Sequence, residues 1–80
     1  MNIKVFPNPT DGMINIDIEN GIPGKYEVQL TNSIGQVVYM KDILWSGNII
    51  HVTNLHVAAG IYNVKVFNKQ FIKNIKLMIQ

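Results

Sequence analysis

The chain has 80 residues, of which 48% are hydrophobic and 15% charged, a composition that suits one small packed domain and argues against disorder. It contains no cysteine, which rules out the disulfide framework common in small secreted domains. No apolar run approaches the roughly 18–20 residues of a membrane-spanning helix, and the first residues lack the features of a secretory signal peptide. We therefore expect either a cytoplasmic protein or a fragment whose export signal lies upstream.

Charge is distributed unevenly along the chain, whose formal net charge is +2. Residues 1–42 carry all five acids and three of the seven lysines, whereas residues 43–80 carry four lysines and no acid. Two interpretations are open: a solvated face on neighbouring strands, or a basic surface that meets an acidic partner or an anionic glycolipid. Nucleic-acid binding is disfavoured because arginine, the usual ligand of phosphates and guanine edges, is absent.

The hydrophobic pattern is that of β-strands. Apolar and polar residues alternate with a period of two, and turn residues separate the runs at intervals of about 8–12 residues. This pattern predicts an all-β fold, a seven-stranded antiparallel immunoglobulin-like β-sandwich. The strands are expected around Ile3–Phe6, Ile14–Glu19, Tyr26–Thr31, Val37–Lys41, Ile49–Val52, Tyr62–Phe67 and Asn74–Ile79. No window has a helical period, and Val57–Ala59 could form a single helical turn at most.

The first connection contains Pro7-Asn8-Pro9 and then a turn that ends on Gly12. Each proline fixes its own φ and keeps the residue before it out of the helical region, so the chain should leave the first strand in an extended course. Gly12 can supply a positive φ in the turn. An alternative makes the oxygens of Asn8, Thr10 and Asp11 calcium ligands, although calcium takes six to eight oxygens and no second acidic cluster is visible.

Two further turns carry glycines. Gly35 lies between the third and fourth strands, where a hairpin turn needs a residue with positive φ. Gly60 precedes Tyr62, which stands at the start of a strand. A tyrosine there can bury its ring and donate its hydroxyl to nearby backbone, as in the tyrosine corner of sandwich domains.

Candidate chemistry is sparse. There is no cysteine nucleophile, His51 and His56 fall on a strand and a turn, and nothing in the sequence brings them together with a serine or a carboxylate. We expect no enzymatic activity and no cofactor or metal. Trp45, assigned to the loop between the fourth and fifth strands, either caps the core or contacts a sugar or a partner.

The ordered signatures from Pro7 to Gly12, from Ser33 to Val38 and from Ala58 to Tyr62, followed by a lysine-bearing last strand, span nearly the whole chain. Together they resemble the C-terminal sorting domain (type A) of proteins exported by the type IX secretion system of Gram-negative bacteria. In the family's Leu-x-x-Gly-x-Tyr corner, either Val57 takes the leucine position or two residues are inserted after Leu55.

The resemblance implies that residues 1–80 are a single C-terminal sorting domain, a fragment of a larger secreted protein. The cargo fused upstream would cross the periplasm to the cell surface or the medium. The outer-membrane translocon would recognise the domain and a sortase-like peptidase would remove it. The residues assigned to translocon recognition are Lys73, Lys76, Leu77 and Ile79. The motif residues assigned mainly structural roles are Pro7, Asn8, Pro9, Gly12, Gly35, Gly60 and Tyr62.

Two other functions remain open from the sequence. The first is an accessory module of a secreted enzyme or adhesin that binds carbohydrate or protein. The second is a structural domain that dimerises its parent through an exposed edge strand. The last strand, from Phe71 to Gln80, would offer unpaired backbone groups to either kind of protein partner if it lies at a sheet edge.

Overall fold

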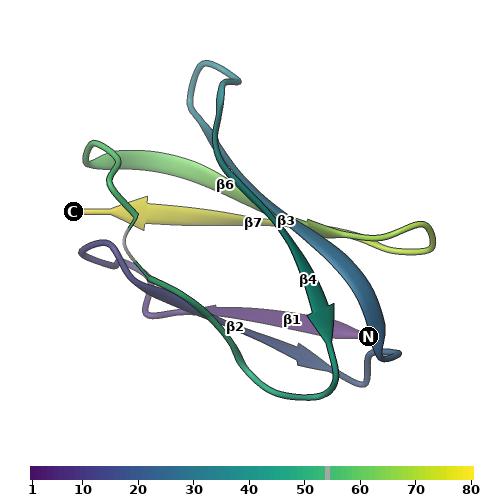
Figure 1. Ribbon diagram of the computed structural model, residues 1–80. Coiled ribbons are helices and arrows are strands. Elements are labelled where there is room, and N and C mark those ends of the chain that lie inside the picture. The colour runs from purple at the N-terminus through teal and green to yellow at the C-terminus, as the bar shows by residue number, and fades with distance from the viewer. Residues whose placement is uncertain (54) are drawn as a thin grey trace.

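The computed structural model describes residues 1–53 and 55–80 and contains seven strands and no helix in these ranges (Figure 1). The strands form two layers, with β1 and β2 in one and β3, β6 and β7 in the other. The bounds are β1 Asn2–Phe6, β2 Ile14–Glu19, β3 Gly24–Asn32, β4 Val37–Trp45, β5 Ile50–Val52, β6 Gly60–Phe67 and β7 Ile72–Ile79.

Each layer is an antiparallel sheet. The smaller sheet has the order β1-β2-β5 and the larger sheet has the order β4-β3-β6-β7. The prediction of an all-β fold with seven antiparallel strands in a sandwich is confirmed, and the arrangement is compatible with an immunoglobulin-like domain. Both sheets therefore have two edges, which are β1 and β5 in one and β4 and β7 in the other.

The core lies between the sheets and follows the period of two. In β2 and β3 every second side chain is buried, and the intervening polar side chains face outward. Full burial of one such aliphatic side chain contributes about 1.5–3 kcal/mol. The buried apolar residues are Ile3, Ile14, Ile16, Ile18, Tyr26, Val28, Leu30, Trp45, Ile50, Val52, Leu55, Tyr62, Val64, Val66, Leu77 and Ile79.

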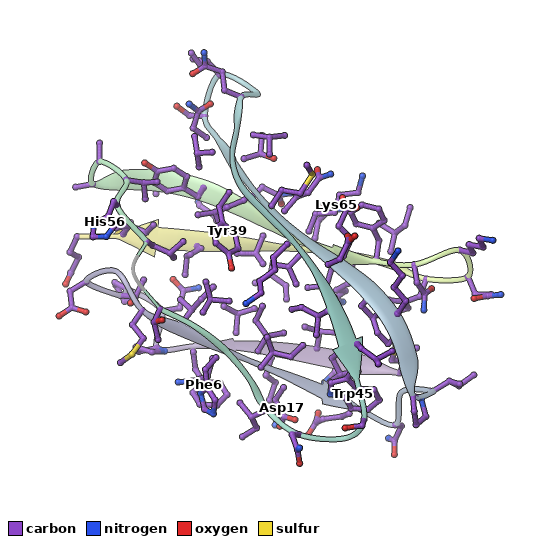
Figure 2. The ribbon with its side chains drawn as sticks, viewed as in Figure 1. Phe6, Asp17, Tyr39, Trp45, His56 and Lys65 are labelled. Carbon is purple, nitrogen blue, oxygen red and sulfur yellow. The ribbon has the colours of Figure 1, made fainter. Side chains whose placement is uncertain are left out.

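Trp45 belongs to this core, so its assignment to a loop is wrong. It is the last residue of β4 and is only 7% exposed. Its ring meets that of Tyr26 edge-on, with the centroids 5.9 Å apart, and its indole N–H donates to the carbonyl of Asn48 at 2.8 Å. Since the indole is buried between the layers (Figure 2), it presents no open face on which a sugar could stack.

The connection from β5 to β6 contains no helical turn at Val57–Ala59, which corrects that expectation. Leu55 is buried and Val57 is partly buried against the core, and extended backbone brings residues two positions apart to the same side. Tyr62 then closes the corner as predicted: its ring is buried and its hydroxyl donates to the carbonyl of Ala58.

The hairpin between β3 and β4 is confirmed. Asn32 organises its turn, because its backbone bonds to Gly35 and Gln36 and its side-chain oxygen accepts from the amides of Ile34 and Gln36. Gly35 has φ of 88° and nothing lies within 4 Å of the position that a Cβ would take. The requirement for glycine at this turn is therefore conformational and not steric.

We predict that Gly35→Val lowers the free energy of unfolding by about 1–2 kcal/mol, because a β-branched residue at this φ is strained. Gly35→Asn is the matched control, since asparagine tolerates the left-handed region, and it should cost much less. Denaturant unfolding of the three proteins measures the difference. Equal stability of the valine variant and the parent would contradict the account.

Candidate functional site: the edge of the last strand

β7 is an edge strand that pairs with β6 on one side only. Leu77 and Ile79, two of the four residues assigned to recognition, point into the core and are 0% and 3% exposed. Their side chains are therefore closed to a partner in the folded domain and instead anchor β7 to the opposite sheet. Near the end of the strand, the exposed side chains are those of Lys76 and Met78, which face outward.

The two lysines assigned to recognition are both exposed and lie on opposite faces of β7. Lys76 stands opposite Asn63 on the outer face of the larger sheet. Lys73 stands opposite the buried Val66 and is on the inner side by register, yet it is exposed. The smaller sheet therefore does not cover this end of β7, and one basic group borders each face of the strand.

The Pro-Asn-Pro segment lies against the other side of β7. β1 belongs to the smaller sheet, but after Phe6 the chain crosses to the edge of the larger sheet, where Thr10 forms a parallel bridge with Ile79. In Figure 1 the loop after β1 lies close to the end of β7 that carries the C-terminal label. Asn8 thus lies beside Lys76 and Met78 along one edge, although these residues are 68 and 70 positions away in the sequence.

Asn8 makes this contact with its side chain. Its amide nitrogen donates to the carbonyl of Lys76 at 2.8 Å, and its amide oxygen accepts from the N–H of Met78 at 3.0 Å. A carboxamide carries one carbonyl and one N–H₂ group, so it reproduces the pairing of a backbone peptide in a strand. The flanking Pro7 and Pro9 have no N–H, and the side chain supplies the donor that these positions lack.

Thr10 continues the contact with its backbone. Its N–H donates to the carbonyl of Met78 at 2.9 Å, and its carbonyl accepts from the N–H of Gln80 at 2.8 Å. Its hydroxyl, which is buried, accepts from the amides of Gly12 and Met13 and donates to the carbonyl of Met13. Gly12 has φ of 134°, in agreement with the predicted turn. We name the segment Asn8–Thr10 the edge clamp.

The sequence reasoning assigned Pro7, Asn8, Pro9 and Gly12 structural roles but missed what Asn8 and Thr10 bind. Their partners lie about seventy residues away, and no local pattern indicates such a pairing. The one local signal is the short polar amide between two prolines, a position at which the backbone cannot form a regular ladder.

The calcium alternative has no support in this geometry. The side-chain oxygen of Asn8 and the hydroxyl of Thr10 already take part in hydrogen bonds within the fold. Over the described residues, no group of three or more histidine, cysteine, aspartate or glutamate side chains could hold a metal ion. His51 is exposed and pairs with the amide oxygen of Asn15 at 2.6 Å.

Both outer faces of the sandwich carry charges of both signs. Lys4 pairs with Glu19 at 3.5 Å on the smaller sheet, and Lys25 pairs with Asp42 at 3.7 Å on the larger sheet. Figure 2 shows Asp17 and Lys65 on opposite outer sides of the sandwich, and the Lys65 ammonium lies 4.5 Å from the centre of the Phe67 ring. Within the part of the chain that the structure describes, Lys69, Lys73 and Lys76 make no ion pair.

Over the described residues, no helix is long and apolar enough to cross a membrane. A family model described as "Secretion system C-terminal sorting domain" matches residues 4–80. The matched range includes both the edge clamp and the whole of β7. A comparison with curated proteins gives no match.

We predict that Asn8→Ala loses both side-chain hydrogen bonds to β7 and destabilises the domain by about 1–2 kcal/mol. Amide exchange gives the sharper measurement, because the N–H of Met78 loses its acceptor and should exchange faster. Asn8→Asp is the matched variant: it keeps an acceptor oxygen for Met78 but loses the donor to Lys76, so the Met78 amide should remain protected.

The amide of Leu77, which points to β6, is the internal control: its exchange should rise only by the factor that the loss of global stability produces, and exchange of the Met78 amide should rise by more. A Met78 amide that stays equally protected in Asn8→Ala would show that the Asn8 side chain contributes nothing to the closure of this edge.

Proposed function

The chain belongs to the family of secretion system C-terminal sorting domains, and from this premise we propose that the exposed edge and lysines of β7 are what the export machinery recognises. The resemblance inferred from the sequence is thereby confirmed. Membership gives the chain the role of a C-terminal sorting signal of type IX secretion. Such a signal acts on cargo fused upstream and directs it to the cell surface or the extracellular space of Gram-negative bacteria.

The observation that carries the recognition proposal is the position of β7. It is an edge strand, it bears Lys73 and Lys76 on its two faces, and it makes no ion pair within the described residues. Unpaired backbone groups on an edge provide affinity for an extended partner, and exposed charges increase the rate of encounter. Leu77 and Ile79 contribute from the core by holding the strand in place.

The finer steps belong to the same proposal. The cargo passes through the periplasm, the outer-membrane translocon binds the folded domain, and a sortase-like peptidase cuts in the connection to the cargo. The exposure of Met1, directly before β1, supports this order, because a connection that enters there stays outside the sandwich and within reach of a peptidase.

The domain itself acts as a label and not as an enzyme. The family is not an enzymatic one. The arrangement of polar groups agrees with this role: the hydroxyl of Thr10 and the amide of Asn8 serve the fold, and His51 bonds to Asn15 on the surface. Burial of Trp45 removes the residue on which the carbohydrate-binding alternative depended.

The test is an export assay in a host that has a type IX system. A reporter with an N-terminal signal peptide is fused to residues 1–80 or left without them, and each fusion is also expressed in a strain of the same host without the translocon. We predict that only the fusion with the domain, in the intact host, reaches the surface or the medium. Periplasmic retention of that fusion, with the domain folded, would refute the sorting function here.

The lysine assignments are tested in the same assay. Lys73→Ala combined with Lys76→Ala should lower export several-fold, because long-range attraction to the partner is lost. Lys41→Ala is the matched control, since Lys41 is an exposed strand lysine on the opposite edge of the same sheet. Equal export by the double variant and the parent would remove both lysines from the recognition surface.

A further inference from the structure

The outer edge of β7 is divided into two halves. Both backbone groups of Met78 point away from β6, since they bond to Asn8 and Thr10. Backbone direction alternates along a strand, so the backbone groups of Ile72, Asn74 and Lys76 point to the same outer side. These positions form one row of donors and acceptors, of which the clamp covers only the end nearer Gln80.

In the half of the edge nearer Gln80, the outward backbone groups are already hydrogen-bonded. The carbonyl of Lys76, both groups of Met78 and the N–H of Gln80 all have partners in the edge clamp. In the other half, the outward groups of Ile72 and Asn74 and the N–H of Lys76 have no partner among the described residues. An open row of this kind is a template for another strand.

The charge around this open segment has one sign. Lys69 in the preceding turn and Lys73 and Lys76 on the strand border it, and residues 60–80 contain no carboxylate side chain. The acids on the outer face of the larger sheet, Glu27 and Asp42, stand on β3 and β4, away from β7, and Asp42 is paired with Lys25.

The other open edge of the sheet lacks this character. In β4 the outward backbone groups belong to Met40, Asp42 and Leu44, because the alternation that starts from the outward Met78 and runs through β6 and β3 directs the residues between them to β3. Lys41 and Asp42 are adjacent there and give charges of both signs. The charges on the β4 edge therefore favour no partner of one sign, whereas the lysines around the open half of β7 favour an acidic partner.

We propose that Ile72–Lys76 accepts an extended acidic segment of the export machinery as a fifth strand of the larger sheet, and that the edge clamp sets where this strand ends. The proposal rests on the sorting function proposed above. The added strand can pair along about five residues, since Asn8 occupies the edge from the carbonyl of Lys76 onward. The lysines on the two faces of β7 then flank the acidic side chains of the partner.

Asn74→Pro tests the backbone contact. Proline removes the outward N–H of residue 74 and leaves the pairing of β6 with β7 intact, and edge strands tolerate proline at such positions. We expect export of the reporter fusion to fall at least tenfold. Asn74→Ala controls for the lost hydrogen bond between the side chains of Asn63 and Asn74, and Met40→Pro controls for proline on the opposite edge. Both controls should export normally.

Thermal unfolding of each purified domain establishes that it is folded, and if Asn74→Pro is not, Ile72→Pro makes the same test at the first residue of the strand. Normal export by the folded proline variant would overturn strand addition at this edge while the sorting function stands. Loss of export in Met40→Pro alone would place the docking strand on β4 and equally overturn the proposal. If the parent fusion is not exported, the sorting function fails and the inference fails with it.

The charge of the partner is tested separately. Lys73→Glu combined with Lys76→Glu should reduce export further than the double alanine substitution, by at least another several-fold, because an acidic segment is then repelled. Equal export by the glutamate and alanine proteins would overturn the acidic character of the partner. The same pair of variants assayed at raised ionic strength should converge, since salt screens exposed charges.

Discussion

The structure depends on two one-sided sheets burying their apolar faces against each other. The chain has no cysteine, so aliphatic packing between the sheets supports the fold without a disulfide. A domain of this size buries only about 60% of the surface that its unfolded chain exposes, so few side chains can be spared from the interface. This explains why Leu77 and Ile79 lie in the core even though the last strand is the one that we propose for recognition.

A sandwich of two open sheets has exposed edge strands, and the two edges of the larger sheet, β4 and β7, differ from each other. β4 carries adjacent opposite charges, which discourage uniform pairing with a neighbour. β7 is closed over one half by Asn8 and Thr10 and remains open over the other half. One half of the strand is thus protected against pairing with other strands, and the other half is where we propose that the partner strand adds.

The strands, the Gly35 hairpin and the Tyr62 corner were predictable because each follows from local chemistry: alternation, a turn residue and a tyrosine near the start of a strand. The sequence could not decide between the two interpretations of Trp45, and it assigned the buried Leu77 and Ile79 to recognition, because burial depends on how one sheet covers the other. The edge clamp also escaped prediction. Its hydrogen bonds join residues that become neighbours only when the chain after β1 crosses to the larger sheet.

The clamp has a consequence for any partner that binds β7. The outward row of backbone groups exists only while β7 is paired with β6 as a strand. The open part of this row ends at Lys76 only while the Asn8 side chain is hydrogen-bonded to Lys76 and Met78. Closing a loop of about seventy residues costs more entropy than forming a local contact, so these contacts depend on the strands between them being in place. A partner that adds to this edge therefore recognises the folded domain, and an unfolded chain with the same last ten residues does not present the same surface.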